Sequence, residues 1–316
     1  MKAWIGFDTS CYTTSLAAVD EAGRVICDHR LPLAVPPGQR GLRQSEALFR
    51  HLRGLEERLD RLREAIGRAE IAAVAASVRP RPVEGSYLPV FLAGSIIGRA
   101  VAAGAGVPFL PTSHQEGHLR AAVEGTCLPQ RFLAFHLSGG TTEILSATRH
   151  GAGFTLAILG GTADLHAGQF VDRLGVMLGL PFPAGPALEE LAARGRPGAV
   201  RLPVAVRGMR VSFSGPLSAA ERLFAAGVAR EDLAAAALAC LATSVLFLLK
   251  ETAAATGLDT AVLAGGVMAN RQIRQKLRED LPGMRLVFAR PELSTDNAVG
   301  VALLAFDFTA GGDRHG

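Results

Sequence analysis

Residues 132–142 read FLAFHLSGGTT, an apolar strand that runs directly into a polar, glycine-containing turn. Two more strand-like runs follow before residue 160. The chain opens in the same way: residues 4–7 are apolar, residues 8–10 read DTS, and two further strands are complete by residue 29. The same order of strands and turns therefore occurs twice, about 130 residues apart. This internal duplication predicts an α/β protein of two related lobes that face a cleft.

The rest of the chain is mostly helical in pattern. Apolar residues at steps of three and four predict a helix over residues 45–68, and an Ala-rich apolar stretch lies within a second helix over 230–256. A short strand is expected over 107–110 and a helix over 268–278. Although residues 233–249 are strongly apolar, the stretch is short for a membrane span and contains Thr and Ser, so we expect a buried helix.

Composition limits the class of protein. The chain has 316 residues, of which 49% are hydrophobic and 20% charged, so a packed core is expected and wholesale disorder is excluded. The net charge of +4 permits RNA as a partner but does not demand it. The N-terminus lacks the features of a secretory signal, which predicts a cytoplasmic protein without a membrane partner.

Four cysteines lie far apart along the chain, at Cys11, Cys27, Cys127 and Cys240. They form no CxxC pair, which argues against a zinc ribbon and against a thioredoxin-type site. Their spread also argues against a disulfide scaffold.

Histidines offer a better metal site. His114 and His118 are four residues apart on a predicted helix, so both rings lie on one face. Glu116 is in the wrong position for the metalloprotease pattern HExxH, and with Ser113 it instead fits a helix capping box. Two further groups could complete a site for iron or zinc. Asp296 opens a helix, where it is a metal ligand or an N-cap, and His136 ends a strand, where it is a ligand or a core residue.

At this point the motifs resemble those of a known family, the tRNA threonylcarbamoyladenosine synthase catalytic subunits, formerly called O-sialoglycoprotein endopeptidases or glycoproteases. The resemblance runs over nearly the whole chain. Its motifs, in order, are DTSC at 8–11, HQEGH at 114–118, SGG at 138–140, GTADLHAGQFVDR at 161–173, PAGP at 183–186, SFSG at 212–215, GGVMAN at 265–270 and STDN at 294–297.

The resemblance implies an actin-like ATPase or sugar-kinase fold, with residues 1–130 and 297–316 in an N-terminal lobe and 131–296 in a C-terminal lobe. It implies transfer of a threonylcarbamoyl group from threonylcarbamoyl-adenylate to N6 of adenosine 37 in ANN-decoding tRNA. It also implies a heteromer with a smaller homologous subunit and an accessory ATPase.

Site residues carry over position by position. The resemblance places one iron or zinc ion on His114, His118 and Asp296, with His136 as a further candidate ligand. The resemblance also implies a set of residues that bind an ATP- or adenylate-type nucleotide: His136, Leu137, Ser138, Gly139, Gly140, Asp172, Gly185, Glu189 and Asn270. Among these, Asp172 and Glu189 would bind ribose hydroxyls, while glycine amides would approach the phosphate or base.

Several positions depart from the family pattern. Tyr12 and Thr13 replace two acidic residues, an Arg/Pro-rich segment replaces a glycine-rich motif over 79–89, and His166 and Gln169 replace an Ala and a Glu. These changes leave open an alternative, a repurposed paralogue that binds nucleotide as a regulatory or scaffold subunit. A third reading is a small-molecule kinase or transferase with Asp8, Asp164 or Asp172 as its base, but it does not explain the histidine pair.

Overall fold

The computed structural model describes residues 1–10, 12–35, 42–151 and 153–312. The chain divides into two compact units. Unit 1 comprises Met1–Thr126, Arg149–Thr155 and Thr295–Gly316, and unit 2 comprises Cys127–Thr148 and Leu156–Ser294. The outer boundaries of the units are within a few residues of the lobe boundaries expected from sequence, but Arg149–Thr155, expected in the C-terminal lobe, belongs to unit 1. The expected lobes and cleft stay predictions. Cys11 and the Pro-rich residues 36–40 lie outside the described residues, as does His315.

Unit 1 is built on a five-stranded sheet. Its antiparallel part is a meander of consecutive strands, and two parallel strands are added beside the first of them. The spatial order is β3 (Val25–Pro32), β2 (Thr13–Val19), β1 (Lys2–Ser10), β4 (Glu70–Arg79) and β5 (Phe109–Ser113). The central strand β1 is buried along nearly its whole length. Such a strand needs cover on both faces.

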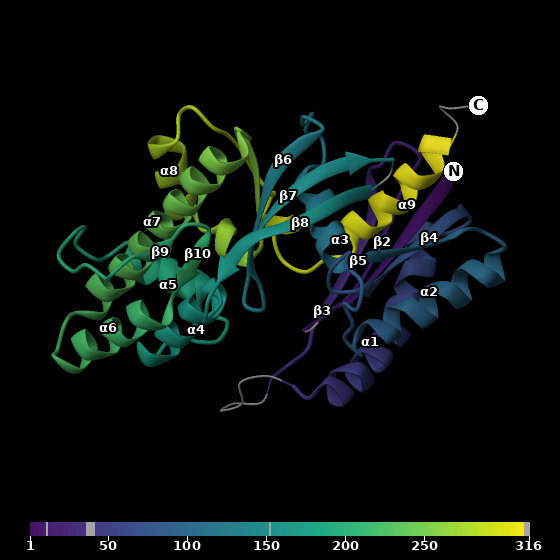
Figure 1. The fold of residues 1–316 in the computed structure, drawn as a ribbon. Helices are drawn as coiled ribbons and strands as arrows, with labels where there is room; N and C mark the ends of the chain where they lie inside the picture. Colours follow the sequence, from purple (N-terminus) through teal and green to yellow (C-terminus); the bar gives the residue numbers. More distant parts are fainter. Residues whose placement is uncertain (11, 36–41, 152, 313–316) are drawn as a thin grey trace. The chain divides into compact units, whose positions relative to one another are not determined.

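Helices cover both faces of this sheet (Figure 1). They are α1 (Gln44–Ile66), α2 (Phe91–Ala105), α3 (His114–Ala122) and α9 (Val299–Gly312). Successive residues of β1 point to opposite faces. Phe7 therefore packs against Gly94 and Gly98 of α2, while Gly6 lies against the backbone of α9 at Ala302. The C-terminal helix is thus part of the core of the N-terminal sheet.

Unit 2 repeats the topology of unit 1. Its order is β12 (Arg285–Phe288), β11 (Thr260–Ala264), β6 (Arg131–Leu137), β7 (Thr142–His150), β8 (Gly153–Thr162), β10 (Arg210–Ser212) and β9 (Ala205–Arg207). Here again an antiparallel meander, β6–β7–β8, carries two parallel strands beside its first strand. The duplication read from the sequence is confirmed, because both sheets share this arrangement.

Helices α4 (Ala167–Met177), α5 (Gly185–Ala192), α6 (Ser214–Ala225), α7 (Arg230–Thr256) and α8 (Arg271–Asp280) complete unit 2. Helix α7 is long and apolar enough to cross a membrane by length and composition, but 78% of its most apolar window is buried inside the protein. It supplies much of the hydrophobic core of unit 2. The expectation of a buried helix is confirmed.

The sequence reading was wrong in three places. The strand expected over 107–110 is β5, which begins at Phe109. The helix expected over 268–278 is interrupted: a 3-10 turn at Gly266–Ala269 precedes α8, and Asn270 caps α8 by accepting a hydrogen bond from the Ile273 amide at 3.0 Å. The short strands β9 and β10 were missed, because three residues are too few to show a period.

Candidate metal centre

The histidine pair is positioned by a tightly capped helix. Strand β5 ends at Ser113, and α3 begins with His114. The Ser113 hydroxyl accepts a hydrogen bond from the Glu116 amide, and the Glu116 carboxylate accepts one from the Ser113 amide at 2.9 Å. This capping box confirms the reading of Glu116 as a cap. The rings of His114 and His118 stand edge to face, with centroids 4.4 Å apart.

The third residue reaches the pair through a close helix crossing. Helix α3 packs against α9, and the contact admits no side chain at two glycines. A Cβ on Gly300 would lie 1.8 Å from the Gly117 carbonyl oxygen, and a Cβ on Gly117 would lie 2.9 Å from Val301. This approach brings Asp296, just before α9, next to the histidines. Asn297 hydrogen-bonds to the first residue of α9, since its Oδ1 accepts from the Val299 amide at 3.0 Å.

Three donor atoms converge at this point. The Nε2 atoms of His114 and His118 are 3.1 Å apart, and Oδ1 of Asp296 lies 3.2 Å from His118 Nε2 and 3.6 Å from His114 Nε2. Two donors about 2.1 Å from one ion, at angles of about 90–109°, lie about 3.0–3.4 Å apart. The spacing and the mixed nitrogen and oxygen set therefore fit a divalent metal ion.

Asp8 contacts His114 on the side of the ring that faces away from the three donor atoms. It is buried at the end of β1, and its Oδ2 lies 2.8 Å from Nδ1 of His114 and accepts from the Ser77 hydroxyl at 2.7 Å. Its Oδ1 accepts from the Ser10 amide at 2.9 Å. With Nδ1 held by this carboxylate, Nε2 of His114 is the nitrogen that faces His118 and Asp296. Carboxylates commonly orient metal-binding histidines in this way.

The charges in this group shift its pKa values. Burial by itself lowers the pKa of His114, but the charge of Asp8, the hydrogen bond to it and the charge of Asp296 outweigh burial and raise the pKa to about 9. Burial raises the pKa of Asp8, yet the charge and hydrogen bond of His114 together with Ser77 lower it on balance. Without a metal ion the group therefore holds a proton, which a bound cation would replace. The role of Asp8 in orienting His114 was missed in the sequence, where Asp8 was named only as a candidate base. The signal that could have indicated this role was its position in the DTS motif near the end of a strand.

Two other histidines highlighted by the sequence belong to unit 2. His136 is buried on β6, between Glu143 of β7 and Ala264 of β11. Its part in metal binding stays a prediction. His166 precedes α4, where its amide donates to the side chain of Gln169 at 3.4 Å.

The glycine turn after β6 has open space where side chains would project. The Ser138 amide donates to the Thr141 carbonyl at 2.8 Å, which closes the turn. A Cβ on Gly139 or Gly140 would meet nothing within 4 Å, and the same holds for Gly185 at the start of α5. Open space at these glycines lets a nucleotide's phosphate or base come close to the backbone. The side chain of Leu137, by contrast, is buried in the core of unit 2.

The predicted ribose-binding carboxylates each hold a backbone amide. Asp172 accepts from the Ala184 amide through Oδ1 at 2.8 Å, and Glu189 accepts from the Arg271 amide through Oε1 at 2.8 Å. Burial raises the pKa of Asp172. These bonds join α4 to the start of α5, and α5 to the start of α8. Each carboxylate uses one of its two oxygens in this way, since each oxygen can accept separately.

Asp164 joins two of the sequence motifs. It accepts hydrogen bonds from the hydroxyls of Ser212 and Ser214 and from the amides of Phe213 and Leu165. Although burial raises its pKa, these four bonds outweigh it and hold the pKa well below its usual range. A carboxylate held so firmly in its charged form is a poor general base, which weakens the reading of Asp164 as the base of a kinase.

Comparison with known proteins decides the family. A family model described as tRNA N6-adenosine threonylcarbamoyltransferase matches residues 41–303. This chain belongs to that family. A tRNA N6-adenosine threonylcarbamoyltransferase of Methanopyrus kandleri is 31% identical over 309 residues, covering 94% of this chain and 85% of the relative. One from Aromatoleum aromaticum is 32% identical, covering 99% of this chain and 93% of the relative.

Solved structures agree on the fold of this tRNA N6-adenosine threonylcarbamoyltransferase family member. Component A of (R)-2-hydroxyglutaryl-CoA dehydratase from Acidaminococcus fermentans matches with a TM-score of 0.58 and 17% identity, covering 98% of this chain and 100% of that chain. A ROK family glucokinase from Streptomyces griseus matches with a TM-score of 0.51 and 14% identity, covering 96% and 99%. At such identities the likeness concerns the fold alone, and the actin-like, sugar-kinase-like class expected from the sequence is confirmed.

Proposed function

We propose that this chain transfers a threonylcarbamoyl group from threonylcarbamoyl-adenylate to N6 of adenosine 37 in ANN-decoding tRNA. The observation that carries the proposal is the convergence of His114 Nε2, His118 Nε2 and Asp296 Oδ1 in a chain of the threonylcarbamoyltransferase family. Family membership indicates the reaction, and the converging donors supply the metal site that the resemblance implies.

The metal ion in this proposal is iron or zinc, held by those three residues with His136 as a further candidate. When bound, such an ion supplies Lewis acidity at the carbamoyl carbonyl. Asp8 keeps the His114 ring in the orientation that ligation requires, through the 2.8 Å contact at Nδ1. The Gly117–Gly300 crossing fixes the distance between α3 and Asp296.

The adenylate is expected to bind in unit 2. Gly139, Gly140 and Gly185, which have open space where a side chain would project, would let its phosphate or base approach the backbone. Asp172 and Glu189 would use their second carboxylate oxygens for ribose hydroxyls, since the first already accepts a backbone amide. Asn270 would act from the loop before α8, where its side chain already caps the helix.

The reaction exchanges one bond for another. The N6 nitrogen of adenosine 37 bonds to the carbamoyl carbon, the bond from that carbon to the adenylate oxygen breaks, AMP leaves, and N6 releases one proton. No residue is assigned as a general base. The contribution of this chain is then to bind and orient the two substrates.

We also place the protein in the cytoplasm, where its tRNA substrate is found. The family resemblance adds a smaller homologous subunit and an accessory ATPase as partners. Both partners enter the test of function, because the full activity of this chain is expected in their presence.

The test is transfer of radiolabelled threonine onto an unmodified ANN-decoding tRNA transcript. Threonylcarbamoyl-adenylate is supplied directly, with and without the candidate partner proteins. Wild-type protein should label the tRNA, and His118→Ala should lose both bound metal and labelling. The matched control is His150→Ala, which removes an exposed histidine at the end of β7 and should retain both.

Two results would contradict the proposal. One is full labelling by His118→Ala. The other is no labelling by wild-type protein with partners present, although metal and ATP still bind. The second result would indicate that the chain uses its ligand site for another acceptor.

A further inference from the structure

Helix α8 of unit 2 carries its three arginines on one face. Arg271, Arg274 and Arg278 are three and four residues apart, so at about 100° per residue they lie within about 60° of one another around the helix. Lys276 lies on the opposite side, where it forms an ion pair with Asp280 at 2.7 Å. We call the three arginines the α8 arginine face.

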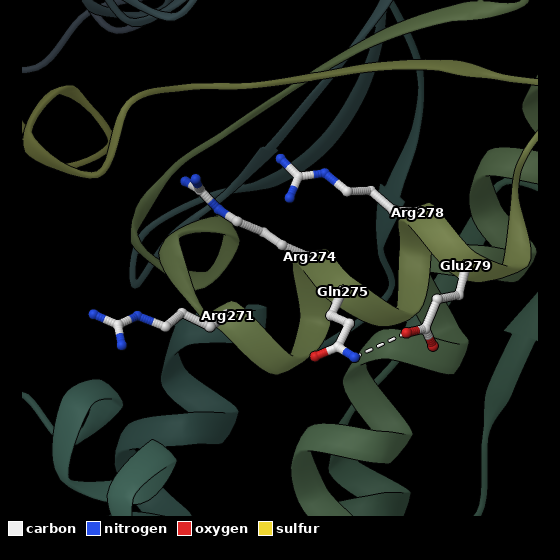
Figure 2. A pocket seen from close by; sticks show the side chains of 5 residues that line it. All are labelled: Arg271, Arg274, Gln275, Arg278 and Glu279. Atoms are coloured by element: carbon white, nitrogen blue, oxygen red, sulfur yellow. Dashed lines mark hydrogen bonds between the residues drawn. The ribbon is translucent and has the colours of Figure 1, made fainter.

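The arginine face borders an open hollow of about 550 Å³, shown in Figure 2. Gln275 and Glu279 complete its lining, and the Glu279 carboxylate accepts a hydrogen bond from Gln275 Nε2 at 2.8 Å. Within the described part of the chain, none of the three arginines forms a salt bridge with a carboxylate. Arg271 and Arg278 are exposed and Arg274 is half-buried. The lining of the hollow therefore carries three positive charges against one negative charge, that of Glu279.

Two of the guanidinium groups are held in place. The Arg274 and Arg278 groups stack on the Phe288 ring, with Cζ atoms 5.2 and 4.9 Å from its centroid. Arg274 also donates to the carbonyl oxygens of Met268 and Ala289. Burial and the neighbouring charge of Arg278 lower the pKa of Arg274, partly offset by Glu189 and Glu292. Like charges held side by side in this way favour an anion between or above them.

We propose that the α8 arginine face binds the phosphate backbone of the tRNA substrate. The guanidinium group is suited to paired hydrogen bonds with phosphate oxygens. The Cα atoms of Arg271 and Arg278 are separated by about 10 Å along the helix axis, a length over which several backbone phosphates of one strand follow one another. This inference rests on the proposed function for its choice of RNA as the polyanion. It adds a contact surface made of residues other than the metal-site residues, and this surface recognises charge rather than base sequence.

The test measures binding of an ANN-decoding tRNA transcript to the full chain by fluorescence anisotropy, from about 50 to 200 mM salt. Each lost phosphate contact should lower the slope of log K against log salt by about 0.7–0.9. Arg278→Gln should show this change in slope and bind tRNA several-fold more weakly. The double variant with Arg271→Gln and Arg278→Gln should show about twice the change in slope. Lys276→Gln is the matched control, because it removes one positive charge from the opposite face of the same helix. It should leave slope and Kd near wild type.

Further arms separate the alternatives. Arg278→Gln should weaken the binding of a non-ANN tRNA as much as that of the ANN tRNA, and it should leave ATP binding unchanged. The proposal is overturned if Arg278→Gln has the wild-type slope, if it weakens ATP but not tRNA, or if wild-type protein binds no tRNA. An acidic protein as the true occupant gives the first of these results together with loss of partner binding. If tRNA binds as expected but wild-type protein with partners transfers no label, the proposed function fails while the arginine face stands.

Discussion

Replacing Asp8 with Asn changes one charge behind the metal centre while keeping the shape of the side chain. In the wild-type protein, Oδ1 accepts from the Ser10 amide at 2.9 Å and Oδ2 faces His114 Nδ1 at 2.8 Å. The asparagine must put its carbonyl oxygen toward Ser10, since an amide NH₂ there would oppose another donor. Its NH₂ group then faces His114, and Nδ1 must accept a hydrogen bond.

The consequence falls on the other nitrogen of the ring. A neutral His114 that accepts at Nδ1 carries its proton on Nε2, the atom 3.1 Å from His118 Nε2. Metal binding must then remove that proton or break the new hydrogen bond. Loss of such a supporting group typically costs about 10–100-fold in metal affinity, which corresponds to about 1.4–2.7 kcal/mol.

The assay is zinc binding to the full chain in competition with a chelator of known affinity. Asp8→Asn should raise the apparent Kd about 10–100-fold. Ser77→Ala is the control, because it removes one hydroxyl donor from Asp8 and leaves the carboxylate on His114; its Kd should stay within a few-fold of wild type. A folded Asp8→Asn protein with the wild-type Kd would refute the reasoning.

Three further predictions concern stability. Gly300→Ala forces α3 and α9 apart and should lower the urea-derived free energy of unfolding by about 1–3 kcal/mol. The control Gly104→Ala lies in open space on α2 and should raise this free energy slightly. Equal effects of the two changes would contradict the close crossing. Burial lowers the pKa of His51 to about 4, although the charges of Asp8 and Asp296 act to raise it. The contribution of the neutral His51 ring to the free energy of unfolding is therefore complete above pH 6.5 and is lost as pH falls toward 4. Between pH 7 and 4.5 wild-type protein should lose about 2 kcal/mol more than His51→Gln, and parallel pH curves would argue against a neutral buried ring. Asp164→Asn should cost about 1–2 kcal/mol at pH 7 and less below pH 4, where protonation removes the charge in the unfolded chain; an unchanged urea midpoint at pH 7 would show that its four hydrogen bonds contribute little.

The fold was predictable because its main signal is repeated. Two meanders with the same order of apolar runs and polar turns indicated a duplication, and both sheets have the corresponding topology. Helix α7 was placed correctly because 27 residues without Gly or Pro allow a single reading. The short strands β9 and β10 could not be found, since the pairing of β10 with β8, and of β9 with β10, depends on tertiary contacts rather than on local pattern.

The candidate site was predictable to a different depth. The spacing of His114 and His118 puts both rings on one helical face, a local property. Asp296 was one of two readings, a ligand or an N-cap, until the family motif favoured the ligand, because no local rule brings together residues 178 positions apart. The physical cause of that meeting is the missing side chain at Gly117 and Gly300, and a glycine in a helix has no distinct sequence signal. The support from Asp8 likewise depends on where β1 ends relative to β5.

Because unit 1 is discontinuous in sequence, the order of synthesis sets when the metal centre can form. His114 and His118 leave the ribosome long before Asp296, and all of Leu156–Ser294 is made in between. Helix α9, which closes the N-terminal sheet at Gly6, comes later still. A nascent chain therefore carries an open sheet and a two-ligand site until unit 2 has emerged. Tight metal binding thus reports that translation has passed the last helix, and a chain that stops before residue 296 has neither the third ligand nor a closed core.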